Sequence, residues 1–235
     1  MPNNITNQIC FGTGKTAEAA FKKAMEDLRP AGGPLGAIDF NALIPMPESL
    51  NILSGSDTRR GIELYRLYLH EKSIHLKDFE KVWEHRIQSD PDLWELGKQA
   101  YENTQKYGVP TWYEWCTEHW GTKWNAYNCQ ILNPTTVQFQ TAWNSVPLIL
   151  TELSRKYPDR KIRYCWADED IGCYVGQCTY KNGGIIQQNI PKDYSVEAYR
   201  MAAKILDVDL RELQDELKIV PTRTKKRAKS KQQER

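Results

Sequence analysis

The hydrophobic period of the chain changes from 3.6 to 2 near residue 121, and this change constrains the fold more than any other feature. Residues 56–120 have the pattern of helices throughout. In residues 136–143, by contrast, Val137, Phe139, Thr141 and Trp143 alternate with Gln138, Gln140 and Ala142, as the two faces of a strand do. Strands and helices therefore both occur, with the helices segregated between antiparallel-looking strands, which is typical of the α+β class. Outside the helical block we expect strands over 4–12, 37–44, 123–131, 136–143, 161–166, 172–180 and 184–189, and helices over 15–28, from Ser145 and over 195–206.

The expected architecture is an antiparallel sheet with helices packed on one face and a mainly helical insertion. Asp209 and Glu212 have the spacing of a capping box, which predicts one more helix after the sheet. The expected boundaries are 1–47 and 122–206 for the sheet domain, 48–121 for the helical insertion, 207–221 for a C-terminal helix and 222–235 for a disordered basic tail.

The composition is that of a soluble, globular protein, with 40% apolar and 26% charged residues among 235. No apolar stretch approaches 18 residues, so no membrane span is expected, and the first residues do not have the pattern of a secretory signal. We therefore expect a cytoplasmic protein without a membrane partner, whose six scattered cysteines are free thiols.

The net charge of +2 conceals an asymmetry between the body of the chain and its end. Residues 222–235 carry +6, so the remaining residues carry −4. A short basic segment can neutralise nucleic-acid phosphates, which makes a weak nucleic-acid contact one hypothesis. The side chains that would make this contact are Lys225, Lys226, Arg227 and Lys229.

The segment 110–128 is dense in aromatic side chains, with four tryptophans within thirteen residues. Their rings can staple the helical block onto the sheet, or they can wall a pocket whose polar groups are Lys123 and Asn125. If this segment is a strand, Lys123, Asn125 and Tyr127 share one face and Trp124 lies on the other.

Asp168, Glu169 and Asp170 follow an expected strand and form the second candidate site. Three adjacent carboxylates can hold a hard cation, bind a basic partner or supply a catalytic pair, and they can equally be a solvated strand end. The sequence leaves these alternatives open.

Two other motifs lack the spacing that their chemistry needs. The string Gly12-Thr13-Gly14-Lys15-Thr16 lacks the earlier glycine of a phosphate loop, because Ile9 stands at that position. Cys116 and His119, with Cys173 and Cys178, match no familiar zinc signature, and no third catalytic group accompanies the Cys–His pair. We therefore expect no metal and no cofactor.

Several strings resemble the YubB ferredoxin-like family, whose members are encoded largely by phages, plasmids and other mobile elements. The resemblance implies a ferredoxin-like α+β sandwich, in agreement with the expected element order, and it implies no iron–sulfur cluster and no established activity. The strings lie at residues 2–7, 40–48, 112–116, 119–126, 141–143 and 167–172, and the resemblance extends from residue 2 to about residue 206.

The leading hypothesis is a non-enzymatic binding protein of a mobile element that acts on a host protein, such as a defence complex, in the host cytoplasm. The first alternative is a nucleic-acid-binding protein that uses the tail and exposed aromatic residues, and the second is an enzyme that uses Lys123 with the carboxylates. The expected binding surface comes from segments that could be neighbouring strands: Lys123, Trp124, Asn125, Trp143, Asp168, Glu169 and Asp170.

Overall fold

A computed structural model describes residues 3–210 of the chain, and its centre is a six-stranded antiparallel sheet. The strand order is β2-β3-β1-β4-β5-β6, so the first strand in the sequence is an interior strand of the sheet. The strands are β1 (Asn4–Cys10), β2 (Tyr127–Asn133), β3 (Thr136–Ala142), β4 (Ile162–Asp168), β5 (Gly176–Lys181) and β6 (Gly184–Asn189).

Apart from the turns and helices of residues 40–119, which lie between α1 and β2, the elements β1, α1, β2, β3, α6 and β4 follow one another as in a ferredoxin-like fold. The β5–β6 hairpin extends the sheet. The α+β class expected from the sequence is therefore confirmed. Helices α1 (Lys15–Asp27) and α6 (Pro147–Lys156) supply the apolar side chains of the main core, which also contains Ile5, Phe139 and Tyr164 of the sheet.

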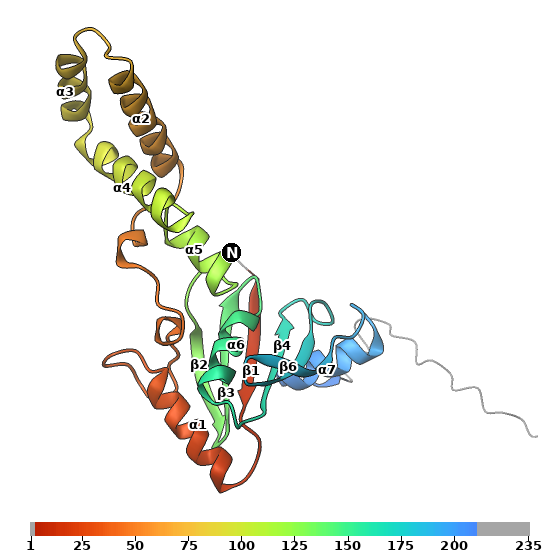
Figure 1. Cartoon of the computed structure of the whole chain (residues 1–235). Coiled ribbons are helices and arrows are strands. Elements are labelled where there is room, and N and C mark those ends of the chain that lie inside the picture. The colour runs from red at the N-terminus through yellow and green to blue at the C-terminus, as the bar shows by residue number, and fades with distance from the viewer. Residues whose placement is uncertain (1–2, 211–235) are drawn as a thin grey trace, which may run out of the picture.

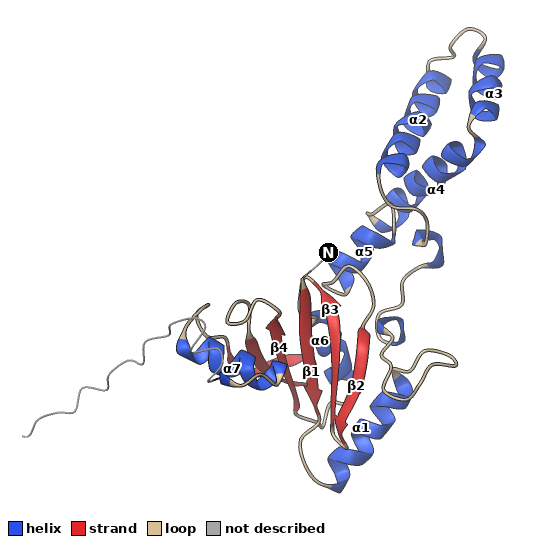
Figure 2. Cartoon of the chain, turned by 180° about the vertical axis from the view of Figure 1, so that it is seen from behind, coloured by secondary structure: helices blue, strands red, loops and turns tan. Residues whose placement is uncertain are grey.

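Helix α7 (Val196–Leu206) is the exception to the expected one-sided packing, because it lies on the opposite face of the sheet from α6 (Figure 2). Its Ala198 and Ala202 form a second apolar cluster with Ala167 of β4. Ala167 points away from the main core because its neighbour Trp166 points into it, so β4 presents an apolar side chain to each face.

The region expected to be a strand over 37–44 instead contains a 3₁₀ turn, Phe40–Ala42. The Asp39 carboxylate accepts a hydrogen bond from the backbone N–H of Asn41, and the Asn125 side chain accepts one from that of Phe40. These side-chain bonds take the place of a strand ladder, so the prediction of a second strand there is wrong.

The helical block forms an arm that projects from one end of the sheet (Figure 1). Helices α2 (Ser56–Ser73) and α4 (Pro91–Tyr107) cross where Gly61 meets Gly97, so closely that a Cβ at Gly97 would lie 2.1 Å from the Gly61 backbone. Aromatic rings of Tyr68, Trp83 and Trp94 pack together beyond this crossing. The arm contains a turn at Glu48–Leu50 and helices α2 (Ser56–Ser73), α3 (Phe79–Ser89), α4 (Pro91–Tyr107) and α5 (Trp112–His119).

Helix α7 is followed by only a few described residues, because the described part of the chain ends at Leu210. Helix α7 begins and ends as the sequence predicts, with the Ser195 hydroxyl accepting a hydrogen bond from the N–H of Ala198. The helix expected over 207–221 lies outside the described residues beyond Leu210, as does the basic tail. None of the described helices combines the length and the apolar character that crossing a membrane requires.

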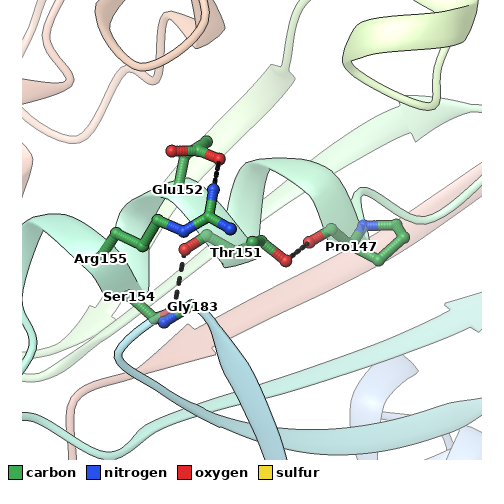
Figure 3. A network of polar contacts seen from close by, with 6 residues as sticks. All are labelled: Pro147, Thr151, Glu152, Ser154, Arg155 and Gly183. Atoms are coloured by element: carbon green, nitrogen blue, oxygen red, sulfur yellow. Dashed lines mark hydrogen bonds and ion pairs between the residues drawn. The ribbon is translucent and has the colours of Figure 1, made fainter.

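The turn between β5 and β6 is anchored to α6 by a hydrogen bond (Figure 3). Asn182 and Gly183 both have positive φ, as the Asn-Gly pair of a two-residue hairpin requires. The backbone N–H of Gly183 donates to the Ser154 hydroxyl at 2.8 Å, and that hydroxyl donates to the Thr151 carbonyl at 2.9 Å. Ser154 is fully buried, so no water is expected to replace it.

Replacement of this serine tests the anchor. Ser154→Ala leaves the Gly183 N–H without its partner, and we expect a loss of about 1–3 kcal/mol in the free energy of unfolding. Chemical denaturation measures this loss. Ser89→Ala removes an exposed hydroxyl that donates to the Arg86 carbonyl, and we expect a change within about 0.5 kcal/mol. Equal effects of the two substitutions would contradict the anchor.

Candidate functional site

The candidate site lies where β3 and β4 meet the beginning of β1. The backbone N–H of Trp143, just after β3, donates to the Asn3 carbonyl at 2.9 Å. On the other side, the N–H of Glu169, just after β4, donates to the Asn4 carbonyl at 3.1 Å. We call the loop that begins with Trp143 the tryptophan loop and the loop that begins with Glu169 the acidic loop. Only β1 separates their parent strands β3 and β4, and adjacent strands are about 4.8 Å apart.

Lys123 lies among three aromatic rings at this end of the sheet. Its Nζ is 4.7 Å from the ring centroid of Trp124, 5.0 Å from that of Trp143 and 5.7 Å from that of Tyr113. These are cation–π distances. Because β2 begins only at Tyr127, strand alternation does not apply to residues 123–126. The prediction that Lys123 and Trp124 lie on opposite faces is therefore wrong.

Asn125 points toward the 3₁₀ turn rather than toward the three rings. Its Oδ1 accepts hydrogen bonds from the N–H groups of Phe40 and Ala126, and its Nδ2 donates to Asp39 at 2.7 Å. Every polar atom of this side chain thus has a partner inside the protein. Asn125 also borders an open hollow of about 380 Å³ with Asn4, Trp124 and Tyr127.

The three carboxylates have different surroundings. Asp168 is only 7% exposed and accepts hydrogen bonds from Asn3 Nδ2 at 3.4 Å and from the Asp170 N–H at 2.8 Å, so it shapes the turn. Glu169 and Asp170 are exposed, with Asn4 Nδ2 donating to Glu169 at 2.6 Å and the Tyr194 hydroxyl donating to Asp170 at 2.8 Å. Among residues 3–210, no three His, Cys, Asp or Glu side chains are arranged to hold a metal ion.

A polar chain connects the two halves of the site through Asn4. The Tyr127 hydroxyl donates to Asn4 Oδ1 at 2.5 Å, and Asn4 Nδ2 donates to Glu169. Burial raises the pKa of the Tyr127 hydroxyl, and the negative charge of Glu169 raises it further. The Asn4 side chain therefore connects Tyr127 of the edge strand β2 to Glu169 of the acidic loop.

All exposed aromatic side chains of the described residues gather at this end of the sheet. Each of the four is at least 36% exposed, whereas the other described aromatic rings are buried or half-buried. Two of them, Tyr174 and Tyr194, are not predicted from the sequence. The four are Trp124, Trp143, Tyr174 and Tyr194.

Contacts join the two missed tyrosines to the rest of the site. The Tyr174 hydroxyl lies 2.9 Å from the Ser145 hydroxyl, two residues after Trp143, and Tyr194 binds Asp170. Trp143, Tyr174 and Tyr194 all have left-handed backbones, with φ of 68°, 42° and 57°. Left-handed backbone is uncommon for bulky residues, and no local sequence pattern predicts it. We name the aromatic–acidic surface by its members: Lys123, Trp124, Trp143, Glu169, Asp170, Tyr174 and Tyr194.

The other tryptophans of the dense segment are structural. Trp115 and Trp120 are buried in the main core, and Trp120 Nε1 donates to the Ile44 carbonyl at 2.9 Å. Trp115 and Trp120 thus pack the end of the helical block against the sheet, whereas the exposed Trp124 is the ring available for binding. Next to them, burial raises the pKa of the Cys116 thiol to about 12, which disfavours a thiolate nucleophile.

Comparison with known proteins finds a match for the part of the chain that contains all seven members of the surface. Residues 120–209 match the family model described as the ferredoxin-like domain in Api92-like protein. This part of the chain is therefore similar to a ferredoxin-like domain, in agreement with the element order described above. The crystal structure of a protein Api92 from Yersinia pseudotuberculosis is similar at 14% sequence identity and a TM-score of 0.34, over 83% of this chain and 99% of that one. The search of curated proteins found no match.

The matched segment lacks the strand that joins its own two halves. It contains β2 to β6, but β1 separates β3 from β4 in the sheet. The N-terminal strand is thus part of the same domain. Its first residue, Asn4, and the preceding Asn3 connect the two loops of the surface.

The coupling through Asn4 makes a testable prediction about Tyr127. Because Glu169 contributes a negative charge that raises the Tyr127 pKa, Glu169→Gln should lower that pKa toward the ordinary tyrosine value. NMR titration of labelled tyrosine rings measures it. Tyr180, whose pKa is raised to about 12 by burial, should not move. An unchanged Tyr127 pKa would contradict the contact.

The position of β1 makes a second prediction. A fragment of residues 120–209 should show no cooperative thermal unfolding, because β3 and β4 lose their shared partner strand. Residues 1–210 serve as the control and should unfold cooperatively, as followed by circular dichroism. Cooperative unfolding of the shorter fragment would contradict the role of β1.

Proposed function

We propose that this chain is a binding protein that holds a partner protein on the aromatic–acidic surface. The observation that carries the proposal is the gathering of all four exposed aromatic side chains at one end of the sheet. Tryptophan and tyrosine dominate the binding energy of protein interfaces because they bury a large area and lose little conformational entropy. On the described surface, no other region presents such anchors.

The way these aromatic residues are held supports the same proposal. Left-handed backbone in a non-glycine residue costs on the order of 1–3 kcal/mol and persists only where surrounding contacts enforce it. Three of the four exposed aromatic residues adopt it, and each has a hydrogen bond that fixes its loop. The rings are thus presented in a fixed arrangement, which reduces the entropy lost on binding.

The biological setting of the proposal comes from the sequence resemblance. Strings such as residues 119–126 and 167–172, which contain much of the surface, resemble a family encoded by phages and plasmids. We propose accordingly that the chain is encoded by a mobile element and acts in the host cytoplasm on a host protein.

The two alternatives have less support from the described residues. The enzyme alternative needs Lys123 to act with a carboxylate, but its ammonium lies over three rings, and no ion pair joins it to a described carboxylate. The nucleic-acid alternative relies on Lys225, Lys226, Arg227 and Lys229, which lie outside the described residues.

Affinity capture from host lysate tests the proposed function, with mass spectrometry of bound protein and analysis of bound nucleic acid. The full chain should capture a specific protein, and Trp143→Ala should weaken that complex about tenfold or more, as loss of a central tryptophan does. Leu67→Ala, on the distant helix α2, removes a side chain of similar exposure and should leave capture unchanged.

Two outcomes would contradict the proposal. One is capture of the same protein with equal affinity by Trp143→Ala and by the full chain. The other is capture of nucleic acid alone, lost at high salt and after truncation at residue 221, which would favour the nucleic-acid alternative.

A further inference from the structure

We propose that the segment bound by the aromatic–acidic surface carries arginine or lysine side chains of a partner protein. This inference rests on the proposed function and adds the chemistry of the partner. It follows from two independent features of the surface, its ring faces and its carboxylates.

The ring faces already hold a cation. The Lys123 ammonium lies within 6 Å of the centroids of Trp124, Trp143 and Tyr113, and no described carboxylate forms an ion pair with it. The attraction of these rings for an ammonium is therefore visible within the chain itself. Trp124 and Trp143 remain 36% and 41% exposed beside Lys123, so ring surface is still free for a second cationic group.

The two exposed carboxylates have acceptor capacity to spare. Glu169 and Asp170 each accept one side-chain hydrogen bond, from a neutral amide and a neutral hydroxyl respectively. An ionised carboxylate has about four acceptor positions, enough for a bidentate guanidinium. Among the described residues no lysine or arginine pairs with either of them, whereas Asp27 and Glu152 elsewhere do have such partners.

A guanidinium satisfies both features at once. It stacks on aromatic faces and also binds carboxylates through two parallel hydrogen bonds, and it remains charged at all relevant pH values. The charge of −4 on residues 1–221 favours approach of a basic segment over an acidic one. An acidic segment would instead meet the Glu169 and Asp170 charges directly.

Replacement of Lys123 should change the affinity in opposite directions for a cationic and an anionic ligand. A cationic ligand competes with Lys123 for the ring faces and is repelled by it, so removal of the ammonium should tighten binding. An anionic ligand would be attracted by Lys123, so the same change should weaken binding. The direction of the effect therefore distinguishes the two classes of partner.

The test uses tetra-arginine amide as the probe and tetraglutamate as its counterpart, titrated into the full chain at fixed ionic strength by calorimetry. Tetra-arginine should bind and tetraglutamate should not. The Glu169→Gln/Asp170→Asn variant should bind tetra-arginine about tenfold more weakly, and Lys123→Gln about twofold to fivefold more tightly. Thermal unfolding of each variant confirms that it is folded.

A matched variant controls for general electrostatic attraction. Asp92→Asn/Glu95→Gln removes the same charge from exposed positions on α4 and should leave the affinity unchanged. Equal weakening by the two charge-neutralising variants, or weaker binding by Lys123→Gln, would overturn the proposal. Truncation at residue 221 also removes a net charge of +6, so its effect is measured at high ionic strength, where general repulsion is screened. Stronger peptide binding there would assign the surface to the chain's own basic segment and overturn the assignment to a partner protein.

The result is separable from the proposed function. If tetra-arginine does not bind but Trp143→Ala still loses the protein captured from lysate, the surface is a protein-binding site and only its preference for basic segments is wrong.

Discussion

The backbone hydrogen bonds of β1 are the interaction on which the rest of the structure depends. This strand pairs with β3 along one edge and with β4 along the other, in both cases over nearly its whole length. Its buried Asn7 adds side-chain bonds to both neighbours, donating to Thr141 at 2.8 Å and accepting from the Tyr164 hydroxyl at 2.6 Å. A buried polar network of this kind is favourable only when all its members have partners, and here each of them has one.

The position of β1 also explains why the candidate site exists. The loops after β3 and β4 are far apart in the sequence. Asn3, just before β1, binds the first of them, and Asn4, the first residue of β1, binds the second. Because these loops are fixed at their base, they can present Trp143 and Tyr174 in backbone conformations that an isolated loop would not keep. The surface is therefore a property of the assembled sheet and not of either loop alone.

Much of the fold can be predicted from local chemistry. The Asn-Gly hairpin and the Ser195 cap rely on bonds between near neighbours, and both appear in the structure. The alternation of residues 136–143 is a periodic signal, and Thr136–Ala142 forms β3. The strand expected over 37–44 fails because Asn125, distant in the sequence, binds the backbone there. Long-range side-chain bonds of this type leave no periodic signal.

The candidate site could be predicted only in part for the same reason. Lys123, Trp143 and the carboxylates come from unusual strings that attract attention in any sequence, and the structure places them around the start of β1. Tyr174 and Tyr194 become members of the surface through left-handed backbone and through contacts with Ser145 and Asp170. Neither feature can be inferred without knowledge of which loops meet.

The central claim is that the tryptophan loop and the acidic loop act as one binding surface. The most direct measurement is the affinity of one purified captured partner for the Trp143→Ala chain, the Asp170→Asn chain and the double variant. We expect each single change to weaken binding of that partner and the double variant to bind it more weakly than either single variant, because each change removes a group that contacts the partner. If the partner responds to one of the two changes and is indifferent to the other, the two loops do not form a single surface.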